Sequence, residues 1–188
     1  MRDPETKTLW SHLLGKGMRG PLEGFELERI PAVITTWTDW KTRHPESSVL
    51  AMERTAERFD SKQWEKARRL VFGVLGGEKG ESPAVGIRRL QKEGVLVLKQ
   101  PAPGIVFTHL SDGGSVQAFR SEVQGKPALF KAVDGGLMKD KATESSWSRD
   151  EGIAVSGPLE GRRLVPVPGT LSYEEAWKKF YPDSRIEQ

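Results

Sequence analysis

Short apolar runs recur along the second half of the chain, and glycine-containing turns separate them. Runs of this length that are rich in valine, leucine and phenylalanine are typical of β-strands. Strands joined by such tight turns pair in antiparallel fashion, because a parallel connection needs about a dozen residues or more. The pattern predicts strands over residues 70–75, 95–99, 104–110, 115–123, 128–133 and 137–139.

Two stretches have helical rather than strand spacing. Residues 83–93 begin with a proline and are followed by Gly94, which is the arrangement that favours the two ends of a helix. Residues 51–69 are highly charged with few apolar positions, which predicts a connecting helical arm. Strands and helices together indicate an α+β fold, mainly antiparallel β with short helices.

The chain also repeats itself. Residues 3–49 match residues 140–186 at a constant offset of 137 and without a gap. About a third of the aligned residues are identical, against roughly one in fifteen expected by chance. The match predicts an internal duplication, with the end of a first unit followed by a complete second unit. We expect structural roles at the matched positions Trp10, Gly20, Pro21, Gly24, Trp40, Pro45, Trp147, Gly157, Pro158, Gly161, Trp177 and Pro182.

Each copy of the repeat contains the segment Gly-Pro-Leu-Glu-Gly. Proline fixes φ and the flanking glycines permit unusual conformations, so the segment predicts a turn between two extended pieces. These pieces are residues 8–13 and 25–30 in the first copy, and 145–149 and 162–167 in the second. We expect each pair to form a β-hairpin or two short strands.

A short helix is expected after the turn in both copies. Thr36 with Asp39, and Ser172 with Glu175, have the three-residue spacing of a capping box. The sequence therefore predicts helices that begin just after Thr36 and Ser172.

A proline ends each predicted helix, because the residue before a proline is pushed out of the helical region. These prolines are Pro45 and Pro182. Trp40 and Trp177 lie on the apolar face of the two helices, and such a face is more often core than a ligand platform. We expect both tryptophans to be buried.

These patterns divide the chain into three parts. Residues 1–49 are expected to be the C-terminal element of a first repeat unit, residues 50–69 a helical connector, and residues 70–188 a complete second unit. The first part lacks the residues that precede the same element in the second copy, so its strand edges and tryptophans need a partner. We expect residues 1–49 to dock on residues 70–186 or to mediate self-association.

Composition narrows the function classes. The 188 residues include no cysteine, and the formal net charge of +3 comes from acidic and basic residues mixed along the chain. No basic stripe results, so we expect no nucleic-acid partner. The longest apolar runs fall far short of the ~20 residues that span a bilayer. The N-terminus lacks the apolar segment of a signal peptide, and the composition assigns no compartment.

No catalytic, cofactor-binding or metal site is predicted. His12, His44 and His109 lie in three segments without ligand spacing, which favours surface or hydrogen-bonded roles. Ser11 and Ser148 follow the repeated tryptophan, but no nucleophile elbow surrounds them. We expect these serines to bond the backbone.

Several spaced motifs carry a resemblance to a known family. Both copies contain Asp-x-x-Thr-(x3)-Trp-Ser, then Gly-Pro-Leu-x-Gly, then tryptophan and His/Tyr-Pro, and residues 72–75, 104–119 and 133–136 follow in the same order. Over nearly its whole length the chain is similar to the bacterial domain-of-unknown-function family 3179. The resemblance implies a duplicated protein that is often exported and has no established activity.

One departure from that family limits what the resemblance implies. In relatives a hairpin of the first copy carries a Cys-Pro-x-Cys motif, whereas the corresponding hairpin here, residues 107–114, contains no cysteine. A thiol or metal function of that motif therefore does not carry over to these residues. The chain is expected to be a short protein or a fragment that begins inside its first unit.

Two functions are compatible with these patterns. The first is a non-catalytic binding or scaffold module, in which two related units pack together and present a groove. The duplication, the six tryptophans and the failure of every catalytic pattern favour it. The second is the supporting half of a redox or metal-dependent enzyme whose cysteine motif lies upstream. Neither names a ligand or a cofactor, and whether the protein is an enzyme stays open.

Overall fold

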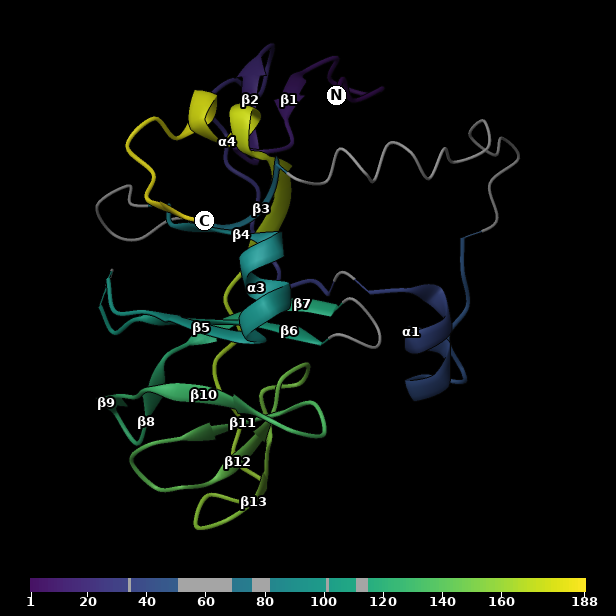
Figure 1. Ribbon diagram of the computed structural model, residues 1–188. Coiled ribbons are helices and arrows are strands. Elements are labelled where there is room, and N and C mark those ends of the chain that lie inside the picture. The colour runs from purple at the N-terminus through teal and green to yellow at the C-terminus, as the bar shows by residue number, and fades with distance from the viewer. Residues whose placement is uncertain (34, 51–68, 76–81, 101, 111–114) are drawn as a thin grey trace.

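A computed structural model describes residues 1–33, 35–50, 69–75, 82–100, 102–110 and 115–188 (Figure 1). Within these residues the chain forms mainly antiparallel sheets with three short helices. The predicted α+β class is therefore confirmed. The predicted connector, residues 50–69, lies almost wholly outside the described residues. None of the described helices is long and apolar enough to cross a membrane.

A three-stranded antiparallel sheet lies between the two larger sheets of the molecule (Figure 1). Its strands are β5 (Val95–Leu98), β6 (Ile105–Leu110) and β7 (Ser115–Arg120), in that order. Nearly all of their residues are buried, because both faces of the sheet are covered. Phe107 belongs to the core cluster on one face and Val106 to the cluster on the other.

A four-stranded sheet in the order β14-β3-β4-β15 packs above the helix α3 (Figure 1). Its pairs are antiparallel except β15 with β4, which is parallel. The elements are β3 (Leu70–Val74), β4 (Ala84–Gly86), α3 (Ile87–Glu93), β14 (Gly169–Tyr173), α4 (Glu174–Phe180) and β15 (Ile186–Glu187). Residues 83–93 were expected to be one helix, but residues 84–86 pair with β3 first, so the helix begins at Ile87.

Helix α4 lies against β3 through Trp177, whose side chain is completely buried. A Cβ atom on Gly73 would lie 2.2 Å from the indole ring of Trp177. Only glycine leaves room at this point of β3, so Gly73 and Trp177 form one packing unit. The predicted burial of Trp177 is confirmed.

The remaining large sheet is antiparallel, in the order β10-β11-β12-β13, with a small two-stranded ribbon beside it. Its core contains Trp147, which contacts Phe130 in an edge-to-face arrangement with ring centroids 6.1 Å apart. The strands are β8 (Glu122–Val123), β9 (Lys126–Pro127), β10 (Phe130–Val133), β11 (Leu137–Asp140), β12 (Ser146–Ser148) and β13 (Ala154–Ser156).

Within the described residues, both the first hairpin and the first helix contact the rest of the chain. The first 49 residues form the hairpin β1 (Leu9–Ser11) and β2 (Lys16–Arg19) and the helix α1 (Trp37–Arg43). At the hairpin, the Tyr181 hydroxyl donates to the Leu13 carbonyl at 3.1 Å. At the helix, the Arg43 guanidinium pairs with the Asp150 carboxylate. Residues 1–49 therefore dock on the chain's own second part, whereas self-association stays a prediction.

The same hydrogen bonds surround Asp3 and Asp140. Each carboxylate accepts from the indole N–H of the tryptophan seven residues later, at 2.9 Å in both cases. Each also accepts from the amide of the threonine three residues later, at 2.6 Å, and from its hydroxyl. Trp10 and Trp147 thus have the same hydrogen-bonded aspartate and threonine beside them, although their aromatic neighbours differ.

The glycine before each repeated proline is required by a close approach. Gly20 and Gly157 have positive φ values of 120° and 95°. A Cβ at Gly20 would lie 2.9 Å from the Cα of Thr8, and one at Gly157 would lie 2.8 Å from the Cα of Ser145. No other residue satisfies both the conformation and the space, which explains the glycine in both copies.

The predicted hairpin of the repeat is wrong in detail. Strand β1 pairs with β2 through a turn at residues 12–15, and the Gly-Pro-Leu-Glu-Gly segment follows β2 instead of joining two strands. Residues 25–30 and 162–167 make only isolated bridges. The chain turns early because Gly15 and its equivalent Gly152 adopt positive φ values of 60° and 64°.

The two helix caps differ from each other. Thr36 caps α1 as predicted, since its hydroxyl accepts from the Asp39 amide at 3.2 Å. Ser172 does not cap α4; its hydroxyl donates to the Tyr173 carbonyl, and the cap residue is Tyr173 without a side-chain bond. The reason is that β14 continues to Tyr173 and draws Ser172 into the sheet opposite Val71.

The predicted burial of Trp40 is wrong. Helix α1 buries none of its residues, and the Trp40 side chain is partly exposed. In the part of the chain that the structure describes, no strand packs on α1 as β3 packs on α4. The sequence repeats the helix, but it does not repeat the sheet beneath it.

Candidate functional site

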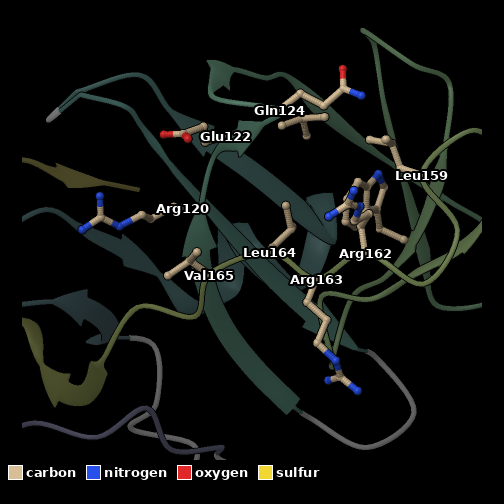
Figure 2. A pocket seen from close by; sticks show the side chains of 10 residues that line it. Arg120, Glu122, Gln124, Leu159, Arg162, Arg163, Leu164 and Val165 are labelled. Atoms are coloured by element: carbon tan, nitrogen blue, oxygen red, sulfur yellow. The ribbon is translucent and has the colours of Figure 1, made fainter.

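A hollow of about 340 Å³ lies beside the end of β7 (Figure 2). We call it the arginine hollow, and its walls come from residues 120–124 and 159–165. The two walls are joined by a backbone hydrogen bond from the Arg120 amide to the Val165 carbonyl, at 2.8 Å. The shape of the hollow therefore depends on backbone pairing and is largely formed before any ligand arrives.

Three exposed arginines line the hollow: Arg120, Arg162 and Arg163. None of them makes an ion pair with another residue that the structure describes. Glu122 is the one acidic residue in the lining. Figure 2 shows the labelled arginines spread around the hollow, without convergence on one point. The arrangement suits a ligand with several negative groups better than a single small ion.

The floor of the hollow is apolar and rigid. It includes the buried residues Trp147, Leu159 and Leu164. The Asp140 carboxylate holds the Trp147 indole in place by accepting its N–H at 2.9 Å. Burial alone would raise the pKa of Asp140, but its hydrogen bonds from Trp147, Thr143 and Ala142 lower that pKa by more. The carboxylate therefore stays charged and keeps its hold on the indole.

A second hollow, of about 410 Å³, lies between α1 and β7. We call it the tryptophan hollow, because the partly exposed Trp40 lines it together with Phe119 and the prolines Pro31 and Pro166. Arg163 lines both hollows, so the two are neighbours on the surface.

His109 is buried near the end of β6, although the sequence favoured a surface or hydrogen-bonded role. Its Nδ1 atom has no hydrogen-bond partner among the described residues. Burial, and then the positive charge of Arg149, lower the pKa of this imidazole. His109 does not line either hollow. It is a neutral core group and carries no role in the site.

The repeated serines bond the backbone, as predicted. Ser11 accepts from the Leu14 amide at 3.2 Å, and Ser148 accepts from the Glu151 amide at 3.3 Å. The Ser148 hydroxyl also donates to the Asp150 carboxylate. Both hydroxyls are used in turn structure, so neither is placed as a nucleophile.

Of the twelve matched positions, Trp147 and Trp40 line the two hollows, and Gly20 and Gly157 fix turns. The sequence pattern did not identify the arginines. A signal was available, because the pair Arg162-Arg163 stands where the first copy has Phe25-Glu26. The charge of the hollow thus arises where the two copies differ.

No group of three or more histidine, aspartate or glutamate side chains is positioned to hold a metal ion in the described part of the chain. The arginine hollow contains no histidine and one carboxylate, so its chemistry suits anion binding.

Comparison with known proteins gives one result. A family model described as "Protein of unknown function (DUF3179)" matches residues 1–66 and 59–184 of the chain. No curated protein and no solved structure matches. The suspected family is confirmed, and the match carries no activity with it.

Proposed function

We propose that this chain, which belongs to the DUF3179 family of proteins of unknown function, is a non-catalytic binding module whose arginine hollow takes an anionic ligand. The observation that carries the proposal is the set of three exposed arginines around an apolar floor. A guanidinium group presents several N–H donors in a plane that matches a carboxylate or phosphate.

The charges of the hollow support this ligand class. Some arginines elsewhere are neutralised within the chain: Arg89 pairs with Glu93 and Glu187, and Arg43 pairs with Asp39 and Asp150. Others, such as Arg19 and Arg88, pair with no acidic residue that the structure describes. The lining of the hollow contains three guanidinium groups and one carboxylate, that of Glu122. A ligand with two or more negative groups would restore the balance.

The scaffold around the hollow supports a binding role as well. The floor residue Trp147 is fixed by Asp140, and the walls are fixed by the bond from Arg120 to Val165. A preformed site loses little conformational entropy when a ligand binds. The alternative, a supporting half of a redox or metal-dependent enzyme, has no observation in its favour among the described residues.

The test is a titration with two small anions, succinate and inorganic phosphate, followed by the NMR signals of the arginine side chains. We expect succinate to shift the signals of Arg120, Arg162 and Arg163. The variants Arg162→Gln and Arg163→Gln should each weaken binding several-fold. Arg88→Gln is the matched control, because Arg88 is exposed on α3, carries the same charge and lies outside the hollow.

Two outcomes would overturn the proposal. One is the absence of any shift at these three arginines with either anion. The other is an equal loss of binding in Arg88→Gln and in the hollow variants, because that would mean attraction by net charge without a site.

A further inference from the structure

The two hollows lie along one pair of chain segments. β7 ends with Phe119 and Arg120, which pair with Pro166 and Val165 of the distant segment 162–167. Phe119 and Pro166 line the tryptophan hollow, whereas Arg120 and Val165 line the arginine hollow. Arg163 belongs to both. A ligand that fills the arginine hollow therefore has a second, less polar hollow within reach of the same arginine.

The wall formed by α1 is fixed by charge. Arg43 pairs with Asp39 on its own helix and with Asp150 across the hollow. Hydrogen bonds from Thr35 and from Arg43 lower the pKa of Asp39, so its pair with Arg43 persists at neutral pH. Arg43 is thereby neutralised and acts as a tether for α1. These ion pairs hold α1, which has no buried residue, beside the tryptophan hollow.

Trp40 is held in one orientation while part of its surface stays exposed. Its indole N–H donates to the Ser47 hydroxyl at 2.9 Å, and its ring lies 4.1 Å from the imidazole of His44. Trp177 has the same two contacts, to Ser184 and Tyr181, and it is buried in the core. The indole of Trp40 is thus preorganised for packing, and in the described part of the chain no strand packs on its helix as closely as β3 packs on α4.

We propose that the ligand is an extended acidic segment of another polypeptide, with carboxylates in the arginine hollow and an adjoining apolar or aromatic side chain against Trp40. This inference rests on the proposed function and names its ligand class. Rigid aromatic anchors next to charged rims are the usual sites of binding energy in protein recognition. Aromatic-lined grooves are used to bind extended polypeptide segments.

The lining favours a polypeptide over a nucleic acid. Glu122 lies in the arginine hollow and Glu151 in the tryptophan hollow, and both would repel a backbone with one charge per nucleotide. A strand of bases also needs successive aromatic platforms, whereas Pro31 and Pro166 offer aliphatic surface. A peptide can place its carboxylates beside the arginines and uncharged residues beside the glutamates.

The test uses capped peptides that carry a pair of glutamates and one phenylalanine, separated by glycine spacers of increasing length. Binding is followed by fluorescence anisotropy of a labelled peptide. At the best spacing, replacing phenylalanine by alanine should weaken binding about tenfold, the effect of a modest aromatic anchor. Trp40→Ala should cause the same loss and leave succinate binding unchanged. Arg162→Gln should weaken both the peptide and succinate.

Trp40→Ala is a sound variant because α1 contributes no buried residue to the core, and its thermal melt is the check on folding. Trp37→Ala is the matched control on the same helix, since Trp37 is 48% exposed and does not line the hollow. It should bind the peptide as the unchanged chain does.

The outcomes separate the two proposals. Binding of succinate with no effect of phenylalanine or of Trp40→Ala would overturn this inference and leave the arginine hollow as an anion site. If neither the peptide nor succinate binds to the unchanged chain, the proposed function is overturned as well. Tighter binding of an oligothymidylate than of the peptide, with a steep dependence on salt, would mean a nucleic-acid ligand instead.

Discussion

The hydroxyl of Tyr181, the residue that follows α4, donates to the carbonyl of Leu13 in the first hairpin, at 3.1 Å. Leu13 and Asp150 occupy equivalent positions of the two matched segments, 137 residues apart. Asp150 in turn pairs with Arg43 on α1. Each short helix is therefore held by the turn of the other segment, and this reciprocal contact ties residues 1–49 to the rest of the chain.

Removing the Tyr181 hydroxyl should weaken that tie. Tyr181→Phe keeps the ring, which stacks on Trp177 with centroids 4.5 Å apart, and removes the donor to Leu13. We expect a loss of about 0.5–1.5 kcal/mol in the free energy of unfolding, the net value of one hydrogen bond. Urea denaturation measures it, and hydrogen exchange should rise in β1 and β2 before the rest of the chain.

The matched control is Tyr173→Phe, because Tyr173 is 53% exposed. It should leave both measurements unchanged. Sedimentation velocity adds a second check. If Tyr181→Phe increases self-association, the released hairpin binds a second copy of the chain. If the variant stays monomeric and hydrogen exchange in β1 and β2 is unchanged, this contact does not hold the first segment.

The two equivalent tryptophans should differ in their effect on stability. Trp177→Ala removes a fully buried ring packed on Gly73 and should cost about 3–5 kcal/mol. Trp40→Ala removes a partly exposed ring from a helix without buried residues, and its cost should be far smaller. Thermal melts of both variants compare them directly. Equal losses would contradict the partly exposed position of Trp40.

Asp140 should stabilise the fold as a charged acceptor. Its carboxylate accepts from the Trp147 indole and from the amide and hydroxyl of Thr143, and its pKa is lowered in the folded state. Stability from such a group is present above the unfolded pKa of about 3.9 and is lost as pH falls through the lower folded pKa. Asp140→Asn should therefore cost about 1–3 kcal/mol near neutral pH and flatten the acid limb of the stability curve.

The comparison variant for Asp140 is Glu144→Gln. The Glu144 side chain is 68% exposed and pairs only with the exposed Lys139 in the described structure. Its replacement should change the free energy of unfolding by less than about 0.5 kcal/mol, because exposed ion pairs contribute little. An Asp140→Asn variant as stable as Glu144→Gln would contradict a structural role for the carboxylate.

The sequence predicted the parts of the fold that local pattern controls. Strands β5, β6 and β7 follow from their apolar runs, and Gly94 ends α3 with a positive φ of 70° as a helix-ending glycine does. Asp3 and Asp140 accept equivalent hydrogen bonds, because the aspartate, threonine and tryptophan that form them are repeated in the sequence.

The remaining features depend on contacts between distant segments. Ser172 fails as a cap because it pairs with β3 in a sheet, and Trp40 stays partly exposed because no described strand packs on α1 as β3 packs on α4. The arginine hollow joins Arg120 to Arg162 and Arg163, which are some forty residues apart in the sequence and meet only through backbone pairing of β7. No local pattern contains that pairing.

The buried imidazole of His109 should make the protein less stable in mild acid. Burial first, and the charge of Arg149 second, lower the pKa of His109 in the folded state. The unfolded chain then binds a proton near its ordinary pKa of about 6.5, where the folded chain does not. Stability is thus fully present above about pH 6.5 and falls as pH decreases from there toward the lower folded pKa.

His109→Leu removes the titrating group and also the Nδ1 atom that has no partner among the described residues. Urea denaturation at about pH 8 and about pH 5 should show a flatter pH dependence for His109→Leu than for the unchanged chain. His12→Gln, at an exposed position, is the control and should keep the original dependence. Parallel curves for His109→Leu and the unchanged chain would mean that another group causes the loss of stability in acid.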